Sequence, residues 1–395
     1  MLSLGPQSMI GAMSYSPRRV MNAWEKIGWH SGHVAVLRAL NAAKFASRAE
    51  IAQATGLSPQ SMTRIGQELI ASGHVSQLAR RHTGGMGQPA IELGIVPGRI
   101  VSLGLVLEHD RITCVISDLV EGVTKRIEKH GDFLRAEPSG EASEALVAET
   151  LRHVPQDAVL LGLGVSQSGF FYDPAVQRVV RRGDVEGWMQ LDLDTRITER
   201  FGIEVIVEND GRAAAAGHLV HGVGAQFDNF FVFIMTRGLG GGAIVGRKLL
   251  RGRMGNAGEI AWLFPHTPHV RPSTESLVMC LGLSSDDELE AAATRALADG
   301  NGALAAWLTD NVAMIEQALL PVCAMIDPEA IVFAGRMPIA IRKALADRVQ
   351  LSGRTFSGVS APLPQIIVDP AADCLEIGAA SLPVARLFEG VSRRR

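Results

Sequence analysis

The 395-residue sequence has no long hydrophobic run and only four cysteines. No stretch of about 18 or more apolar residues occurs, so we expect no transmembrane helix. The first residues lack a basic start followed by an apolar segment, so we expect no secretory signal peptide and a cytoplasmic location. The cysteines are widely spaced and form no CxxC pair, which predicts neither a disulfide framework nor a cysteine-based zinc site.

Charge is distributed unevenly along the chain. Residues 1–100 contain ten Lys and Arg but four Glu, a net charge of +6, whereas the rest of the chain carries −9. A basic N-terminal region followed by an acidic remainder is typical of a nucleic-acid-binding module joined to a separate domain. Chance variation in surface charge produces the same asymmetry, so charge alone leaves both interpretations open.

Local signals near the N-terminus predict two helices joined by a tight turn. Ser47 and Glu50 have the spacing of a capping box, so a helix is expected to begin there and to end at Gly56. Ser58 followed by Pro59 then starts a further helix that stops before residue 73. Short strands are expected at 75–78 and 90–93, with a glycine-rich turn between them. Together these elements predict a winged helix-turn-helix.

The second helix of this motif has the pattern of a DNA-recognition helix. Met62, Ile65 and Leu69 recur on one face and are expected to pack inward. Polar side chains that can contact bases and phosphates project from the other face, and two arginines lie in the expected wing; the predicted DNA contacts are Gln60, Ser61, Thr63, Arg64, Gln67, Arg80 and Arg81. Any three-helix bundle could share the helical spacing, but the turn, the polar face and the positive charge together favour binding to double-stranded operator DNA.

The remaining chain alternates between strand and helix signals. Residues 1–32 show no clear period and are predicted to be an arm, 33–97 a DNA-binding domain, and 98–395 an α/β domain with a mixed sheet. Apolar runs predict strands at 101–107, 112–117, 160–165, 205–207, 230–235 and 331–334. Helices are expected at 142–153, 285–298 and 303–325.

Residues 47–75 resemble the winged helix of regulators in the ROK family (repressors, open reading frames and sugar kinases). The shared pattern is SRAE, an aliphatic residue, Ala, and then TGLS before the recognition helix. The wing tip departs from it, because Gly87-Gln88-Pro89 lacks the usual arginine. The resemblance extends over about residues 33–385 and implies a two-lobed, actin-like (ribonuclease H-like) sugar-kinase domain with a ligand cleft between the lobes.

The resemblance also implies where a ligand binds. In VENDGRAAAAGH (207–218), Asn209 and Asp210 match residues that hold sugar hydroxyls, and Asp210 matches the general base of the kinases. The alternative for an Asp at this place is a cap on the following helix. Glu259 in GNAGEIAW matches a further sugar contact, and Glu275 aligns with another. Gly169, Ser166 and Trp188 are expected near the same cleft, although Trp188 fits core packing better.

Several family motifs are degraded. Residues 103–107 read LGLVL where the first phosphate loop of the kinases reads DxGGT. Arg237 replaces a small hydroxyl residue in the second loop, where Gly238 and glycines 240–242 are expected to form a turn between two strands. Trp262 replaces the zinc-binding histidine, and Cys280 alone remains of the zinc cysteines. We therefore expect no metal, no cofactor and no catalysis.

The sequence thus favours a DNA-binding transcription regulator, a repressor of carbohydrate-metabolism genes that responds to a sugar or sugar derivative. One alternative is an active ATP-dependent sugar kinase with an added DNA-binding domain. Another is a DNA-binding structural protein whose second domain only dimerises. We expect a homodimer or homotetramer. The sequence names neither the effector nor the operator.

Overall fold

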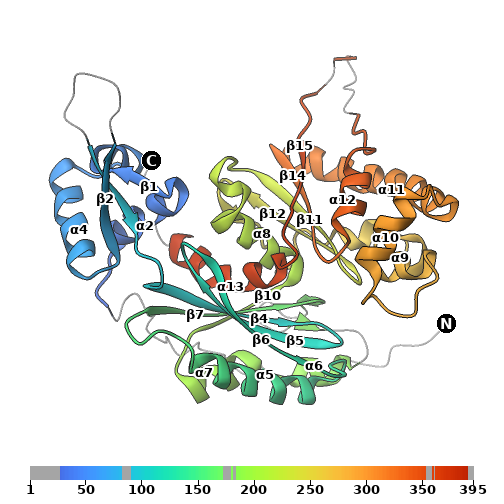
Figure 1. Cartoon of the computed structure of the whole chain (residues 1–395), viewed down its shortest axis with the longest axis horizontal. Coiled ribbons are helices and arrows are strands. Elements are labelled where there is room, and N and C mark those ends of the chain that lie inside the picture. The colour runs from blue at the N-terminus through green and yellow to red at the C-terminus, as the bar shows by residue number, and fades with distance from the viewer. Residues whose placement is uncertain are drawn as a thin grey trace.

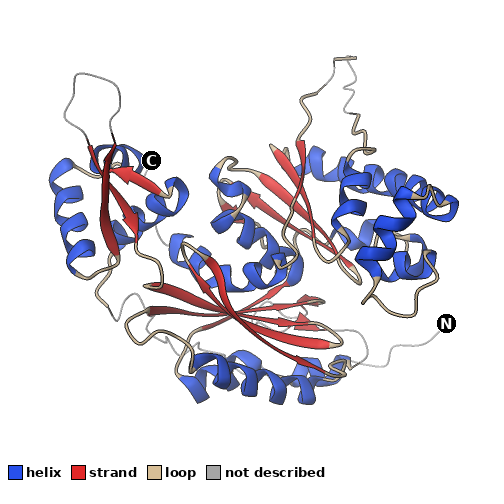
Figure 2. Cartoon of the chain, viewed as in Figure 1, coloured by secondary structure: helices blue, strands red, loops and turns tan. Residues whose placement is uncertain are grey.

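The computed structural model describes residues 27–81, 90–171, 179–180, 184–352, 358–359 and 361–389. These residues form a small N-terminal domain and two lobes, each lobe built on a five-stranded sheet (Figures 1 and 2). This is the predicted α/β architecture of a winged helix joined to an actin-like kinase fold. No helix among the described residues combines the length and apolar character needed to cross a bilayer.

The N-terminal domain is a winged helix. Its helices are α2 (Ser31–Ala43), α3 (Arg48–Thr55) and α4 (Pro59–Ala71). Its strands are β1 (Phe45–Ser47), β2 (Val75–Arg81) and β3 (Ala90–Ile95), arranged antiparallel in the order β1-β3-β2. α2 begins two residues before the predicted domain start at residue 33, and both strands of the wing are longer than predicted.

The predicted caps set the helix ends in this domain. Ser47 Oγ accepts a hydrogen bond from Glu50 N (3.3 Å), and Glu50 Oε2 accepts one from Ser47 N (2.7 Å). Gly56 ends α3 in the left-handed region, with φ of 71°. Ser58 Oγ accepts from Ser61 N (3.2 Å) at the start of α4, with Pro59 at the first helical position. Each bond satisfies a backbone group that the helix itself leaves unpaired.

The first lobe contains a sheet with strand order β10-β7-β4-β5-β6. The strands are β4 (Ile100–Leu107), β5 (Arg111–Asp118), β6 (Gly122–His130), β7 (Val159–Gln167) and β10 (Val205–Asn209). A separate short pair consists of β8 (Phe170–Phe171) and β9 (Val179–Val180). Helices α5 (Ala136–Leu151), α6 (Val185–Gln190) and α7 (Leu193–Phe201) cover one face, and α8 (Asp210–His221) and α13 (Cys374–Glu389) lie on the other (Figure 1).

The second lobe contains a sheet with strand order β13-β12-β11-β14-β15. The strands are β11 (Phe230–Met235), β12 (Leu239–Val245), β13 (Lys248–Leu249), β14 (Ala330–Ala334) and β15 (Gln365–Val368). The helices on its outer side are α9 (Thr274–Cys280), α10 (Leu289–Ala298), α11 (Gly302–Ile326) and α12 (Ile339–Ala346). Three single-turn 3-10 helices are η1 (Val223–Ala225), η2 (Ile260–Leu263) and η3 (Pro268–Val270).

Helices α8 and α13 pack against each other between the two sheets (Figure 1). Small residues permit this contact: a Cβ on Gly217 would lie 3.0 Å from the Cα of Gly378, and one on Gly378 would lie 2.7 Å from the backbone of Ala213. Residues 213–216 are all alanine and fully buried. The two helices therefore meet almost backbone to backbone, and larger side chains at these glycines would separate them.

The predicted glycine-rich turn was partly wrong. Glycines 240–242 lie within strand β12 and pair with residues 232–234 of β11, so only Thr236, Arg237 and Gly238 form the turn. A Cβ on Gly242 would lie 2.5 Å from Gly211 O, which shows that these glycines allow β12 to approach α8 closely. Close packing of β12 against α8 requires glycine at position 242.

Candidate functional site

The recognition helix α4 presents a polar face to solvent. Met62, Ile65 and Leu69 are buried against the domain core, as the periodicity predicts. The predicted base-contacting side chains lie on the other side of the helix, where all are exposed except the half-buried Ser61: Gln60, Ser61, Thr63, Arg64 and Gln67. A helix with this face can enter a major groove without any rearrangement of its core.

Arg64 forms a surface ion pair. Its Nη1 lies 2.7 Å from Glu68 Oε1 one turn further along α4, and the Arg64 side chain is 57% exposed. Exposed pairs of this kind contribute little stability, so the guanidinium can move to a base or phosphate at small cost. Arg80 and Arg81 lie on β2, but their side chains and the wing tip at residues 82–89 are outside the described part of the chain.

A cavity of about 330 Å³ lies between the two lobes. The β4–β5 turn and the segment after β7 line one side, and the β11–β12 turn lines the other. Of the predicted ligand residues, Asp210 and Gly169 line this cavity, together with Ser166. Ser166 Oγ is buried and has no hydrogen-bond partner among the described residues. A hydroxyl and a carboxylate facing one cavity are suited to binding a polyol.

Asn209 lies directly behind the cavity wall. Its Oδ1 accepts from Gly211 N (2.8 Å) and caps α8, while its Nδ2 donates to Gly169 O (2.7 Å). The helix-capping role that the sequence offered as an alternative for Asp210 is shared, because Asp210 Oδ1 also accepts from Gly211 N (2.8 Å). Through these two bonds Asn209 connects the start of α8 to the loop that carries Gly169, and its side chain is only 3% exposed. Asn209 thus positions two cavity residues.

Glu259 belongs to a buried ionic cluster next to Asp210. Arg212 is fully buried, with Nε 2.7 Å from Glu208 Oε1, Nη1 3.8 Å from Glu259 Oε1, and its guanidinium 5.3 Å from the centre of the Phe171 ring. Burial, with the charges of Asp210 and Glu208 adding to it and Arg212 opposing it, raises the pKa of Glu259 to about 7. Glu259 therefore titrates near neutral pH, where its protonated form can donate a hydrogen bond.

Arg237 spans the cavity mouth. Its Nη1 lies 2.9 Å from Nε2 of His109 in the β4–β5 turn, and its Nη2 lies 3.5 Å from Glu275 Oε1 at the start of α9. His109 belongs to the first lobe and Arg237 to the second, so this contact joins the lobes. Glu275 itself is not among the residues lining the cavity and reaches it only through Arg237.

An ion-pair network lies beside the strand that replaces the first phosphate loop of the kinases. Residues 103–107 form the fully buried end of β4. Arg336 after β14 lies 2.9 Å from Glu108 and 2.8 Å from Glu376 of α13, and Arg111 lies 2.8 Å from Glu108. Burial alone would raise the pKa of Glu108, but Arg336 and Arg111 hold it at about 2. The bond between Arg336 and Glu108 joins the two lobes at a second place, while Glu376 Oε2 is buried with no hydrogen-bond partner among the described residues.

This network was not predicted from the sequence, although Arg336 in FAGRMP (333–338) stands where the kinases that the chain resembles have a glycine. Its members come from segments separated by more than two hundred residues, as the Arg336–Glu108 bonds illustrate. A pattern of charged residues along one chain gives no signal for pairs formed at such separations. The one available clue was the replacement of a family glycine by a long cationic side chain.

The residues present do not fit the zinc site implied by the resemblance. Trp262, in the place of the histidine ligand, lies on η2 with 67% of its surface exposed. Cys280 is the one cysteine of segment 269–282, and it ends α9. Trp188 is 2% exposed and its Nε1 donates to Leu134 O (3.1 Å), so Trp188 packs in the core of the first lobe and does not line the cavity.

One helix connects the cavity to the DNA-binding domain. α8 begins at Asp210, and near its other end Val220 O accepts a buried hydrogen bond from Asn41 Nδ2 of α2 (2.8 Å). Arg38 Nη1 of α2 also lies 3.5 Å from Phe388 O at the end of α13. A single hydrophobic cluster contains core residues of the winged helix together with Val220 and Leu387. The two domains are therefore packed against each other.

Comparisons with known proteins agree with this architecture. The chain is 29% identical over 356 residues to the protein y4fQ of Sinorhizobium fredii, covering 87% of this chain and 88% of that one. It is 24% identical over 215 residues to the xylose repressor of Bacillus subtilis, covering 54% of this chain and 55% of the repressor. A solved ROK family transcriptional regulator, a homologue of the E. coli MLC protein, superimposes with a TM-score of 0.68 at 18% identity, covering 94% of this chain and 98% of that one. Residues 110–351 match the model of the ROK family, more than half of the chain, and the protein therefore belongs to the ROK family.

Proposed function

We propose that this protein is a cytoplasmic DNA-binding transcription regulator, a repressor of carbohydrate-metabolism genes, whose kinase-like lobes bind a sugar or sugar derivative without phosphorylating it. The winged helix supplies an exposed polar recognition face on α4. The cavity supplies Asp210, Gly169 and Ser166 as hydroxyl partners. The full-length match to a ROK transcriptional regulator concerns the fold and agrees with this domain combination.

The observation that carries the proposal is the ion-pair network around Arg336. A phosphoryl-transfer site needs positioned groups that bind the phosphates and their metal ion. Here Glu108 and Arg336 are bonded to each other at 2.9 Å beside an apolar strand, so their charges are already neutralised. A cavity of this kind favours binding over catalysis.

Helix α8 provides the route from effector to DNA. Asp210 at its first residue faces the cavity, and Val220 near its last residue is bonded to the winged helix through Asn41. A ligand that shifts the start of α8 changes the position of α2, and the recognition helix packs on α2. A homodimer or homotetramer bound to a pseudo-palindromic operator would convert this shift into a change in the spacing of two recognition helices.

The test begins with DNA selected from a random pool, because the operator is unknown. Fluorescence anisotropy then measures affinity for the selected and for random DNA, with and without sugars from a panel that includes D-xylose. We expect at least one sugar or sugar phosphate to change affinity for the selected DNA. Asp210→Ala should abolish that change and leave ligand-free affinity intact, whereas Asp299→Ala, an exposed carboxylate at the end of α10, should behave as wild type. Equal affinity for the selected and the random DNA would refute the proposal that the protein is a sequence-specific transcription regulator.

The alternative, an active sugar kinase carrying a DNA-binding domain, is favoured by one observation. Asp210, which matches the kinase base, does line the cavity. Incubation with ATP, magnesium and a sugar already shown to bind should yield no sugar phosphate. Turnover at the ordinary kinase rate of about 1–100 per second that Asp210→Ala removes would establish the kinase instead.

A further inference from the structure

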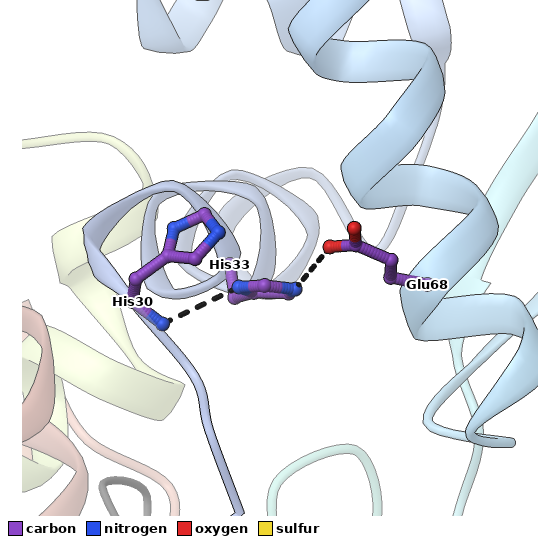
Figure 3. Close-up of side chains that lie close together, drawn as sticks. All are labelled: His30, His33 and Glu68. Carbon is purple, nitrogen blue, oxygen red and sulfur yellow. Dashed lines mark hydrogen bonds and ion pairs between the residues drawn. The ribbon is translucent and has the colours of Figure 1, made fainter.

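Two histidines and a glutamate lie together where the DNA-binding domain begins (Figure 3). His30 immediately precedes α2, His33 lies in its first turn, and Glu68 projects from α4 toward them. One ring nitrogen of each histidine and one carboxylate oxygen of Glu68 all lie within 4.8 Å of one another. We call these three residues the α2–α4 cluster.

The α2–α4 cluster is held in place by surrounding contacts. Trp29, next to His30, is 7% exposed and meets the ring of His74 edge-on at 5.1 Å. His33 is also 7% exposed, and its Nε2 lies 2.9 Å from Glu68 Oε2. The rings of His30 and His33 are 4.1 Å apart. Packing therefore fixes the buried His33 ring before any ligand arrives, with the exposed His30 and Glu68 beside it.

The sequence led us to expect no metal, on the basis of the degraded family segment; outside that segment, we propose that His30, His33 and Glu68 bind a divalent transition-metal ion, zinc in the first instance, which links α2 to the recognition helix α4. Two imidazoles and a carboxylate form a donor set that zinc accepts, with a fourth position left to water. Ligand atoms of a tetrahedral zinc ion are about 3.4 Å apart, given bond lengths near 2.1 Å. The observed spread of up to 4.8 Å requires small side-chain rotations, which the exposed His30 and Glu68 permit.

Protonation of the histidines is compatible with such an ion. Burial and the adjacent His30 hold the pKa of His33 below its ordinary value of 6.5, so its ring is neutral at neutral pH. Its Nδ1 accepts a long hydrogen bond of 3.3 Å from His30 N, which places the ring proton on Nε2. An ion bound at Nε2 moves that proton to Nδ1 and breaks this weak bond, a cost near 1 kcal/mol that metal coordination exceeds.

Metal binding would also release a DNA-reading residue. Glu68 Oε1 is the partner of Arg64 Nη1 at 2.7 Å, and Arg64 is a predicted base contact. A cation on Glu68 repels the nearby guanidinium and competes for the carboxylate. Arg64 is then available to DNA, so zinc is expected to strengthen operator binding. This coupling rests on the proposed DNA-binding function, whereas the metal site itself does not.

Cobalt(II) titration of the full-length, chelator-treated protein tests the site. Four-coordinate cobalt absorbs visible light strongly, and we expect a saturable band with one ion per chain that zinc displaces. His30→Ala and Glu68→Gln should each weaken cobalt binding by at least the roughly 10- to 100-fold that losing an outer-shell partner costs a metal site. Both positions are exposed, so both variants should fold, which circular dichroism checks.

Two control variants should bind cobalt as wild type does. His130→Ala changes another exposed histidine paired with a glutamate, Glu128 at 3.4 Å, outside the α2–α4 cluster. Cys280→Ser removes the remaining cysteine of the degraded zinc segment. No saturable band in wild type, or a band unchanged in His30→Ala and Glu68→Gln, would overturn the site. Loss of the band in Cys280→Ser would place the metal elsewhere and overturn it equally.

Affinity for selected DNA, measured with and without zinc, tests the coupling. Wild type should bind several-fold more tightly with zinc, and His30→Ala should show its metal-free affinity in both conditions. An unchanged wild-type affinity beside an intact cobalt band would refute the coupling and leave the site established. No sequence-specific DNA binding in any condition would refute the proposed regulator while the cobalt result still decides the site.

Discussion

Asn41 of the winged helix donates its Nδ2 hydrogen to the carbonyl oxygen of Val220, across 2.8 Å in the buried interface between the two domains. Asn41 is 7% exposed, and its Oδ1 has no hydrogen-bond partner among the described residues. Val220 lies in the last turn of α8, the helix whose first residue faces the interlobe cavity. This hydrogen bond therefore joins α8, which begins at the interlobe cavity, to helix α2 of the DNA-binding domain.

Asn41→Ala should uncouple effector binding from DNA binding. The substitution removes the bond to α8 and leaves the Val220 carbonyl unpaired, a cost of about 1–3 kcal/mol in unfolding free energy. Sugar affinity should stay as in wild type, because Asn41 does not line the interlobe cavity. DNA affinity measured with and without the effector should differ less than in wild type.

Asn311→Ala is the matched control. Asn311 is also buried, its Nδ2 donates to Trp307 O at 2.8 Å, and its Oδ1 likewise lacks a partner among the described residues. It lies within α11 of the second lobe, away from the domain interface. A similar loss of stability with normal effector response is expected. If the effector changed DNA affinity equally little in both variants, the loss of stability, and not the loss of the interface bond, would explain the weaker response.

Arg64→Ala should weaken binding to the selected DNA by about 1–3 kcal/mol, because a guanidinium that contacts a guanine edge discriminates by that amount. Binding to random DNA should change little. Arg152→Ala, an exposed arginine at the end of α5, serves as the control. Anisotropy titrations on both DNAs provide the measurement, and equal losses on selected and random DNA would contradict a base-reading role.

Arg81→Ala should weaken all DNA binding alike and reduce its salt dependence, since a phosphate contact releases a counterion regardless of sequence. Titration of one DNA across a series of salt concentrations measures the slope. A loss confined to the selected sequence would assign Arg81 to base readout instead.

Glu259 should make the protein less stable as pH rises from about 4.5 to 7. Its pKa is raised to about 7, chiefly by burial, so the folded state keeps a proton that the unfolded chain releases above its ordinary value of 4.5. The free energy of unfolding therefore falls through this window, by an amount on the order of 3 kcal/mol. Glu259→Gln, which stays neutral, should lose this fall and exceed wild type in stability at pH 8.

Urea unfolding of wild type and Glu259→Gln at pH 4.5 and pH 8 measures the difference. Asp194, whose pKa is also raised to about 7 by burial and by Asp192, contributes to the same window in both proteins and cancels in the comparison. Asp194→Asn should accordingly leave the Glu259 contribution intact. Parallel pH profiles for wild type and Glu259→Gln would show that the Glu259 carboxyl is ionised in the folded protein at neutral pH.

Arg336→Ala should destabilise the protein by about 1–3 kcal/mol, because it removes the cation shared by Glu108 and the buried Glu376 and leaves them only their outer partners Arg111 and Arg126. Arg348→Ala is the control, since that arginine is exposed, lies just after α12, and its side chain donates to Ala344 O at 2.7 Å. Its effect should stay within about 0.5 kcal/mol. Denaturant midpoints compare the two, and equal small effects would contradict a structural role for the network.

The winged helix was predictable because its signals are local. The Ser47–Glu50 capping box and the left-handed Gly56 act within one helical turn, and both occur where expected. Strand β6 was missed, since its exposed, highly charged residues 124–130 show no apolar alternation. The start of α5 was placed six residues late, because Ala136 lacks a side-chain cap before it. Pairing with a neighbouring strand and packing decide these cases, and neither is visible in one segment.

The candidate site was predictable where a motif is contiguous and not where contacts are distant. Asp210 and Gly169 came from short motifs and do line one cavity. The sharing of Gly211 N between Asn209 Oδ1 and Asp210 Oδ1 at the helix cap depends on backbone geometry that a dipeptide does not specify. The α2–α4 cluster joins His33 to Glu68 across two helices, and no spacing rule within a single helix relates them.

In the proposed signal route, the close contact between Gly217 and Gly378 is the point about which α8 would tilt. Seven residues, about 10 Å, separate it from Asp210, and three residues, about 4.5 Å, separate it from Val220. A helix that tilts about this point is a lever with unequal arms, so the end near the DNA-binding domain moves in the opposite direction and roughly half as far. A larger movement at the cavity would thus produce a smaller movement of the packed DNA-binding domain.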